Sequence, residues 1–576
     1  PDRVLAVRRE RLPFAPEVEV RLALVEAAGR VALRHRLLAA EAAAWLSRLT
    51  GEGFPPGLRL AALAQLARCA PDALPGDVVR VVTGLLRQLR SAPGRRSGAA
   101  PALDAPAGAA AAGEAVAAVD AYPDAAGEPP AEERAQPVAR VSQLWALSDE
   151  EAPVRTGPWT ADLLRTLHVG LDDRVAERTA LLTDQLRSPD RCQRIEALRM
   201  CGGLIRTWRG SYEELVRLVG EQLATPDPRL AEAAAHVLEE LFGLAAPAAD
   251  ALAARVAADP GAWVRDWPSG PPALGSAVKA LARLGDARAV PALAAALERP
   301  EVPHDVGFAI GCLGSAAAPL AGVLRRRLGE VPLDERVHDR AGPLLTGLAA
   351  LRADEALPEV LRVLHGAPEY RGEWVRTEAL RALGSFGPAA RGVLPELRAL
   401  LRSPGATSAT EAAKALWAVG GDAEAVLPVL IEGLRAERAH ELRSAVDALG
   451  LLGARASVVA PRLRALLAHD ELWLRVDAAI ALWEVSGRAD ESVPVLLAAW
   501  EQNRHVRVRV AEGLARMGAA GAGSEAAHVL RAELTSVRRH NAMDGGYGSH
   551  DTYEDEKLLA LCRRALPGNT GKGPAT

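Results

Sequence analysis

The sequence is poor in lysine, cysteine and aromatic residues, and it lacks long hydrophobic runs. Lysine occurs only at Lys279, Lys414, Lys557 and Lys572, although arginine is abundant. The cysteines are scattered without a CxxC pair, so we expect reduced core residues rather than disulfides or a zinc site. No apolar run reaches the roughly 18 residues that span a bilayer, and nothing resembles a signal peptide. These absences predict a cytoplasmic protein without a membrane segment.

The charge balance and the missing catalytic motifs narrow the function further. A net charge of −4 leaves no global basic surface for nucleic acid. The sequence contains no GxSxG, no HExxH and no cysteine within a basic signature. We therefore expect no enzyme and no cofactor, although geometry rather than a motif finally defines a catalytic site.

One pattern occurs four times at a fixed step between residues 374 and 518. Alanine–leucine pairs recur every 33 residues, at Ala382-Leu383, Ala415-Leu416, Ala448-Leu449 and Ala481-Leu482. Prolines keep the same step, at Pro395, Pro428, Pro461 and Pro494. A period of about 20 to 50 residues indicates stacked supersecondary units, each of which buries its apolar face against its neighbours.

The spacing predicts two short amphipathic helices in each unit. Ala478, Ala481, Leu482 and Val485 lie at i, i+3, i+4 and i+7, on one face of a helix. The recurring proline is expected in the first turn of the second helix, where its missing N–H has no helical partner. The first helix is expected to end in positive φ at the glycine that follows it, which is Gly387, Gly420, Gly453 or Gly487.

The segment from Asp470 to Pro494 carries a family resemblance. It combines the acidic Asp470, a Leu-Arg pair, an Ala-Leu pair, Gly487 and Pro494 in one order. This order resembles a HEAT repeat of the short type found in phycobilisome-lyase-like proteins. With the period, the resemblance implies an all-α fold, an armadillo-like α-solenoid of about ten stacked antiparallel helix pairs. The Ala, Gly and Arg content is typical of GC-rich coding sequences such as those of actinobacteria.

Composition divides the chain into five parts. Residues 1–90 are expected to form degenerate helical repeats, and the Ala/Pro/Gly-rich residues 91–158 a disordered linker or loop. The HEAT-repeat solenoid is expected over 159–523. A capping helix pair with a polar loop is expected over 524–566, and a disordered tail over 567–576.

The loop after Arg539 is the one concentration of His, Asp and Tyr in the chain. His540, Asp544, His550, Asp551 and Asp555 could supply ligands to a divalent metal, but their spacing matches no known metal signature. A polar loop between two helices explains the composition equally well. We expect no metal there and keep His550 and Asp551 as candidate partner-binding residues.

Aromatic residues suggest two further candidate surfaces. Trp374 and Trp473 share one column of the repeat with His440, and an exposed column would form a ladder suited to a partner. Packing of the turn against the adjacent unit is the alternative. Trp263 and Trp267 lie in a proline-rich insert over 259–272, where the period breaks.

Arg504, His505, Arg507 and Arg509 form a short basic cluster near the end of the array. Such a cluster could attract an acidic segment or nucleic acid. The neighbouring Glu501 and Glu512 favour a solvated face of mixed charge instead.

These observations favour a non-catalytic scaffold that binds a protein or peptide along the solenoid surface. A bilin-lyase-like enzyme or chaperone is the alternative implied by the family resemblance. Nucleic-acid binding, known for some HEAT proteins, is a further alternative. The sequence identifies neither a partner nor a bilin site.

Overall fold

The computed structural model describes residues 18–91 and 158–566, apart from 260–262, 268–269, 369–371, 403–405, 519–520, 522 and 543–550. The chain divides into two compact units, Pro1–Asp172 and Asp173–Thr576. The linker predicted over 91–158 and the tail predicted over 567–576 lie almost entirely outside the described residues.

The N-terminal unit is a group of helices around α4. Its elements are α2 (Val18–Arg34), α3 (Arg36–Leu49), α4 (Pro56–Cys69), the 3-10 turn η2 (Pro71–Ala73), α5 (Val78–Ser91) and α6 (Pro158–Gly170). Every residue of α4 from Leu60 to Ala67 is buried, because α2, α3, α5 and α6 all pack on this helix. Helix α6, which the sequence analysis assigned to the main solenoid, therefore belongs to the N-terminal unit.

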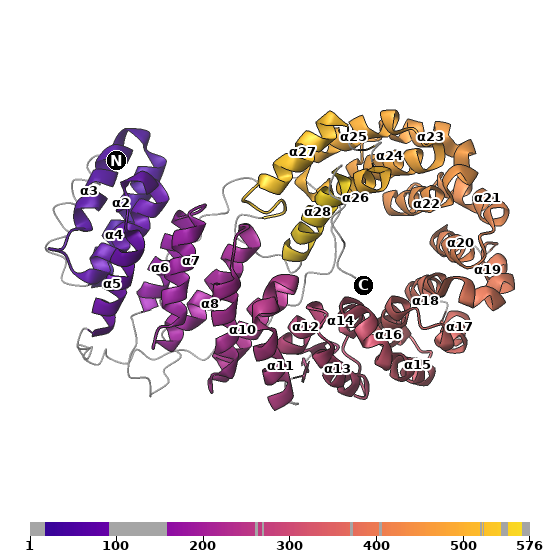
Figure 1. Cartoon of the computed structure of the whole chain (residues 1–576), viewed down its shortest axis with the longest axis horizontal. Helices are drawn as coiled ribbons and strands as arrows, with labels where there is room; N and C mark the ends of the chain where they lie inside the picture. Colours follow the sequence, from indigo (N-terminus) through magenta and orange to yellow (C-terminus); the bar gives the residue numbers. More distant parts are fainter. Residues whose placement is uncertain are drawn as a thin grey trace, which may run out of the picture. The chain divides into compact units, whose positions relative to one another are not determined.

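The C-terminal unit is a curved double row of helices, and Figure 1 shows the two rows as an inner and an outer layer. The inner row comprises α8 (Arg191–Thr207), α10 (Pro228–Leu241), α12 (Ser276–Arg283), α14 (Val306–Leu313), α16 (Val337–Leu351), α18 (Gly372–Phe386), α20 (Ala406–Gly420), α22 (Ala439–Leu452), α24 (Leu472–Ser486), α26 (Arg507–Met517) and α28 (Asp551–Ala565). The outer row comprises α7 (Val175–Leu186), α9 (Glu213–Glu221), α11 (Ala249–Ala258), α13 (Val290–Leu297), α15 (Ala321–Glu330), α17 (Leu357–Gly366), α19 (Leu394–Leu400), α21 (Ala423–Gly433), α23 (Ala460–Leu466), α25 (Ala489–Gln502) and α27 (Ser524–Thr535). Each inner helix packs on the next from α8 to α28. The predicted all-α solenoid is confirmed.

Small side chains allow the inner helices to approach closely. The stripe alanines Ala415, Ala448 and Ala481 are each 1% exposed. A Cβ on Gly307 of α14 would lie 2.4 Å from the carbonyl oxygen of Pro343 in α16, so only glycine fits there. Close approach maximises the apolar contact between neighbouring units, which no single helix pair could supply alone.

Two kinds of turn join the helices of a pair. Seven-residue 3-10 turns, η5 (Phe242–Ala248), η8 (Gly314–Leu320), η10 (Gly387–Val393) and η11 (Gly453–Val459), each begin at a residue with positive φ. After α24 the chain turns directly at Gly487, with φ of 72°. The cap predicted at Gly420 is wrong by one residue: Gly420 ends α20, and Gly421 has the positive φ, 65°. Pro395 and Pro461 occupy the first turn of α19 and α23 as predicted, whereas Pro428 and Pro494 lie inside α21 and α25.

Two stretches, Pro228–Ala258 and Val306–Glu330, are long and apolar enough to cross a membrane by length and composition alone. Each stretch is a pair of solenoid helices separated by a turn, with positive φ at Phe242 and Gly314. We therefore assign both stretches to the packed array. The insert between α11 and α12 contains a short antiparallel pair of strands, β1 (Val264–Arg265) and β2 (Ala273–Leu274), with Val264 opposite Leu274.

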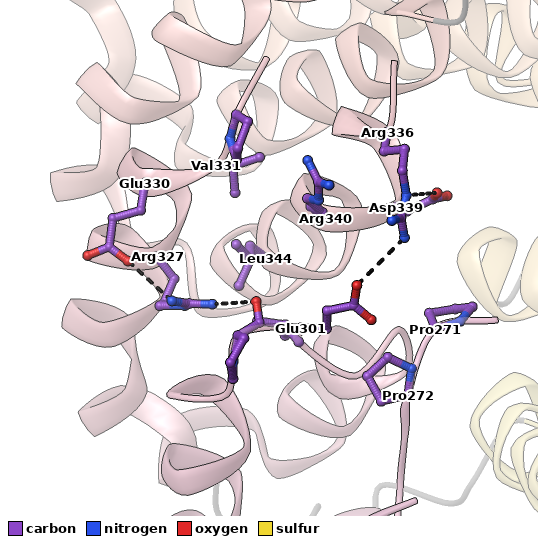
Figure 2. Close-up of a pocket in the computed structure, with 13 residues that line it drawn as sticks. Pro271, Pro272, Glu301, Arg327, Glu330, Val331, Arg336, Asp339, Arg340 and Leu344 are labelled. Atoms are coloured by element: carbon purple, nitrogen blue, oxygen red, sulfur yellow. Dashed lines mark hydrogen bonds and ion pairs between the residues drawn. The ribbon is translucent and has the colours of Figure 1, made fainter. Parts of the chain in front are cut away.

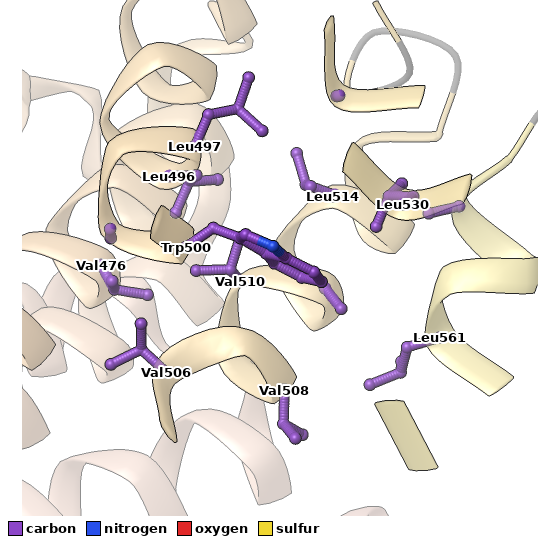
Figure 3. Packing of buried hydrophobic residues seen from close by; sticks show 14 of the residues in the cluster. Val476, Leu496, Leu497, Trp500, Val506, Val508, Val510, Leu514, Leu530 and Leu561 are labelled. Carbon is purple, nitrogen blue, oxygen red and sulfur yellow. The ribbon is translucent and has the colours of Figure 1, made fainter. Parts of the chain in front are cut away.

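The last helices share one hydrophobic core. Figure 3 shows Trp500 of α25 among apolar side chains of α24, α26, α27 and α28, including Leu514, Leu530 and Leu561. Trp500 is 2% exposed, and Leu530 is fully buried. This core binds the C-terminal helix pair to the regular repeats.

The C-terminal end of this unit returns to its beginning. Helix α28 packs on α8 and α10 (Figure 1). The backbone N–H of Arg209 donates to Val537 O at 2.7 Å, and that of Arg539 donates to Thr207 O at 2.9 Å. The inner row is therefore a closed ring, whereas the sequence analysis expected a terminal pair that caps an open end.

Candidate functional site

A buried cluster of charges holds the ring closed. The Asp555 carboxylate, fully buried on α28, accepts hydrogen bonds from Arg209 at 2.6 and 2.8 Å and from Arg539 at 2.7 Å. The His540 backbone N–H and ring Nδ1 lie 3.0 and 2.8 Å from Asp555 Oδ1. Arg209 also contacts Glu533 at 2.6 Å. We name Arg209, Glu533, Arg539, His540 and Asp555 the closure cluster.

Electrostatics favour the ionised form of Asp555. Burial by itself would raise the pKa of the carboxyl, but the hydrogen bonds from Arg209 and His540 and the positive charge of Arg209 lower it well below its usual range. The same contacts raise the pKa of Arg209. Both oxygens of Asp555 are occupied by protein donors.

Two of the candidate metal ligands, His540 and Asp555, have a structural role in the closure cluster. Of the residues weighed as metal ligands, His540 and Asp555 do meet, but beside two guanidinium groups that would repel a cation. Asp544, His550 and the side chain of Asp551 lie outside the described residues. Among the residues that the structure describes, no group of three or more His, Cys, Asp or Glu side chains could hold a metal ion.

Ion pairs between neighbouring helices cover much of the inner row. Lys279 of α12 contacts Glu239 of α10 at 2.8 Å, Arg443 of α22 contacts Asp477 of α24 at 2.8 Å, and Lys557 of α28 contacts Glu512 of α26 at 2.8 Å. Burial would raise the pKa of Glu239, but His236, Lys279 and Arg283 together lower it to about 2. The basic groups of these pairs are already neutralised within the protein.

The inner helices from α14 to α18 expose aromatic side chains. Phe308 is 43% exposed and Trp374 is 71% exposed, both on inner helices. The rings of His338 and Trp374 lie 6.2 Å apart. We name Tyr553, Phe242, Phe308, His338 and Trp374 the aromatic arc.

The aromatic arc extends across the ring closure, from Phe242 after α10 to Tyr553 on α28. Phe242 lies 5.0 Å from Tyr553 of α28 and 6.4 Å from Phe308, centroid to centroid. The Arg283 guanidinium lies 4.5 Å from the Phe242 ring centre, within the range of a cation–π contact. Tyr553 is 42% exposed, so closure adds an aromatic side chain from the last helix to those of the first inner helices.

A hollow of about 350 Å³ lies within the α14–α18 sector. It is lined by polar, aromatic and small residues from three inner helices, from the loop before α14 and from the insert before α12: Pro271, His304, Gly307, Phe308, His338, Asp339, Gly342, Pro343, Thr346 and Glu378. His304 Nδ1 lies 3.0 Å from Pro272 O; because a carbonyl only accepts, this nitrogen carries the proton. In the neutral ring, Nε2 is then an acceptor.

The residues of the predicted tryptophan column differ in their exposure. Trp374 is exposed as a partner-binding surface requires, and His440 is exposed at the start of α22. Trp473 is only partly exposed, because it packs against the C-terminal apolar core and Arg443 lies over its ring at 5.2 Å. The continuous exposed ladder is therefore wrong, and Trp374 alone provides an open tryptophan face in this column.

The predicted insert lies at one edge of the ring. Trp263 donates its ring N–H to Val256 O at 2.8 Å, which makes it a packing residue. Trp267 is 46% exposed and lies beneath Arg265 at 5.5 Å. A hollow of about 360 Å³ lies beside Pro271 and Pro272. Figure 2 shows that two arginines lining it contact carboxylates: Arg327 contacts Glu330, and Arg336 contacts Glu301 and Asp339.

The predicted basic cluster is taken up by internal contacts. Arg504 donates to Ala542 O at 2.9 Å, and Arg507 pairs with Glu533 at 2.9 Å. Arg509 pairs with Asp477 and Asp447, both at 2.8 Å. His505 is exposed, and its backbone N–H donates to Asn503. These residues do not form a free basic patch.

Sequence reasoning did not identify Phe308, His338 or Glu378, and of the closure cluster it singled out only His540 and Asp555, as possible metal ligands. The closure cluster joins residues more than 300 positions apart, which no local pattern links. Phe308 and His338 fall in units whose length departs from 33 residues, so they were not aligned with the tryptophan column.

Comparisons with known proteins agree with this architecture. Residues 372–450 match the family model described as HEAT repeats, so this stretch of the solenoid consists of HEAT repeats. No curated protein matches the chain.

Solved structures with a similar fold are much more distant. Yeast importin-beta, Kap95p, is 10% identical over 98% of this chain and 74% of its own, with a TM-score of 0.46. Kap95p bound to RanGDP is 9% identical over 97% of this chain and 74% of its own, with a TM-score of 0.42. The complex of CpcE and CpcF of phycocyanin lyase from Nostoc sp. PCC7120 is 21% identical over 50% of this chain and 94% of its own, with a TM-score of 0.29. With identities and TM-scores this low, these matches add nothing to the assignment of the fold or the function.

Proposed function

We propose that the protein is a non-catalytic scaffold whose inner row binds a segment of another protein. The observation that carries the proposal is the aromatic arc, where Trp374 and Phe308 are exposed on inner helices whose neighbours carry interhelical ion pairs. Aromatic side chains beside polar groups are the usual anchors of protein interfaces.

The distribution of charge supports a protein partner over nucleic acid. Phosphate binding requires basic side chains that are free to exchange counterions for phosphate. Lys279, Arg443, Arg509 and Lys557 on the inner row are each paired with a carboxylate. A nucleic-acid partner would have to break these pairs.

Three of the cysteines support a role without covalent chemistry; Cys192 is exposed, so the expectation of a core residue is wrong at that position. Burial raises the pKa of Cys201, Cys312 and Cys562, which disfavours the nucleophilic thiolate. Cys201 and Cys562 are buried within helices of the array. Both behave as small apolar core residues.

Site-specific photo-crosslinking tests the proposal. A photoreactive phenylalanine replaces Thr346, which lines the inner hollow, or Arg435, which is 73% exposed in the turn after α21. Irradiation in native cell extract is expected to give a defined crosslinked protein from position 346 and not from position 435. Trp374→Ala should remove this product, whereas the control Trp267→Ala, at the edge of the ring, should leave it. Equal crosslinking from both positions would contradict an inner binding face.

A further inference from the structure

The inner row contains two sites that correspond by repeat position, and one is filled by the protein itself. The first lies between α16 and α18, and the second lies between α22 and α24. Their alignment follows from burial: Leu344, Leu345 and Leu348 of α16 correspond to Ala445, Val446 and Leu449 of α22, and Ala379, Leu380 and Leu383 of α18 correspond to Ala478, Ala479 and Leu482 of α24. Trp374 then corresponds to Trp473, and Glu378 corresponds to Asp477.

In the second site an arginine occupies the space between the two helices. The guanidinium of Arg443 lies 5.2 Å from the Trp473 ring centre, and its Nε donates to Asp477 Oδ2 at 2.8 Å. A cation thus interacts with an aromatic face and a carboxylate together. The Asp477 carboxylate is also shared with Arg509, at 2.8 Å.

In the first site the position of Arg443 is occupied by Gly342. The tryptophan and the carboxylate are retained as Trp374 and Glu378, but no side chain extends from residue 342 over the ring, and Trp374 is 71% exposed. The hollow of about 350 Å³ lies here, lined by Gly342, His338 and Glu378. Trp374 does not line the hollow but lies next to it, with its ring 6.2 Å from that of His338.

The polar groups of this hollow suit a cation. Among the described residues that line it are two carboxylates, Asp339 and Glu378, and neither lysine nor arginine. The Asp339 carboxylate also lies 4.0 Å from Arg336, which lines the neighbouring hollow, so Glu378 is the carboxylate that corresponds to Asp477. Pro343 in α16 has no N–H for the carbonyl of Asp339, which leaves that carbonyl without its helical donor. Glu378 contacts Arg381 through Oε1 at 2.7 Å. Asp477 accepts hydrogen bonds from Arg443 and Arg509, which shows that one carboxylate here can bind two guanidinium groups at once.

We infer that this hollow binds an arginine side chain of the partner protein, with the guanidinium over Trp374 and against Glu378. The inference rests on the proposed function and specifies what the inner row recognises. The partner's arginine takes the place that Arg443 takes in the second site. The volume is at the lower end of the range of small-molecule pockets, about 300 to 1,000 Å³, which fits one long side chain.

Gly342→Arg is the decisive variant, because it supplies the missing arginine from within the chain. A Cβ added at Gly342 comes no closer than 3.8 Å to the nearest side chain, that of His338, so the first atom of the new side chain meets no clash. Gly342→Ala is the matched control that adds the Cβ without the charge. Trp374→Ala and Glu378→Gln remove the two recognition groups separately.

The probes are a fluorescein-labelled tetra-arginine peptide and its tetra-citrulline counterpart, measured by fluorescence anisotropy on the full chain. Wild type and Gly342→Ala should bind tetra-arginine with similar affinity and bind tetra-citrulline about tenfold or more weakly. Gly342→Arg, Trp374→Ala and Glu378→Gln should each weaken tetra-arginine binding by about tenfold. Circular dichroism and thermal melting confirm that each variant is folded.

Three results would overturn the inference: no binding of tetra-arginine to wild type, equal binding of the two peptides, or unchanged binding in Gly342→Arg. The crosslinking experiment at position 346 distinguishes this failure from failure of the proposed function. A specific crosslinked partner combined with any of these results would keep the scaffold and exclude the arginine site. The absence of that partner would reject both.

Discussion

Removing the charge of Asp555 should open the ring while the repeats stay folded. Asp555→Asn keeps the size of the side chain but withdraws the negative charge from Arg209 and Arg539, whose side chains are 11% and 1% exposed. Breaking a buried, hydrogen-bonded ion pair from one side costs about 3 to 5 kcal/mol. Helix α28 should stay attached to α26, because Leu558, Leu561 and Cys562 belong to the apolar core.

Hydrogen exchange measures this opening directly. The amides of Arg209 and Arg539 form the two backbone bonds across the closure. A loss of about 3 to 5 kcal/mol corresponds to an increase in their exchange rates of roughly two to almost four orders of magnitude. Exchange of the regular repeats over 372–487 should be unchanged, and small-angle scattering should show a larger radius of gyration.

Glu556→Gln is the matched control. Glu556 contacts the same arginine, Arg539, at 2.8 Å but is 43% exposed, so its loss should cost less than about 1 kcal/mol. The reasoning is refuted if Asp555→Asn leaves exchange at Arg209 and Arg539 as slow as in wild type. A uniform rise in exchange along the whole chain would also refute it, because the cluster would then stabilise the fold as a whole.

Three further predictions concern pH, turn geometry and the core. The pKa of Asp555 is lowered in the folded state, so its contribution to the stability of the closure is present above the unfolded pKa of about 3.9 and is lost as pH falls through the folded value. Opening at Arg209, measured by hydrogen exchange, should therefore increase only in acid, and this acid response should be absent in Asp555→Asn. Gly453→Ala, at φ of 58°, should lower the free energy of unfolding by about 1 to 2 kcal/mol in urea titrations, whereas Gly392→Ala, where a Cβ meets nothing within 4 Å, should be neutral or stabilising. Trp500→Ala should cost about 3 to 5 kcal/mol and lower the midpoint of the C-terminal melting transition, and an unchanged midpoint would contradict the packing shown in Figure 3.

The two tryptophans of one column show how far the sequence could identify the site. Trp374 and Trp473 occupy the same repeat position, and the sequence left open whether they bind a partner or pack. Their exposure differs: Arg443 and the C-terminal apolar core cover Trp473, whereas Trp374, with Gly342 at the position of Arg443, is 71% exposed. Alignment of the irregular α16 unit with the regular ones would have revealed this difference.

The sequence by itself determined the repeat, the buried Ala–Leu stripes and most of the helix ends. These features follow from the 3.6-residue period of a helix and from the positive φ that glycine tolerates at Gly387, Gly453 and Gly487, so they are legible within one unit. Only the tertiary structure decided that the row closes and that Arg209 meets Asp555, 346 residues away. Closure depends on a small rotation at every interface between units, and the sum of these rotations brings the ends together. No local pattern encodes that sum. The same closure places Tyr553 beside Phe242 in the aromatic arc.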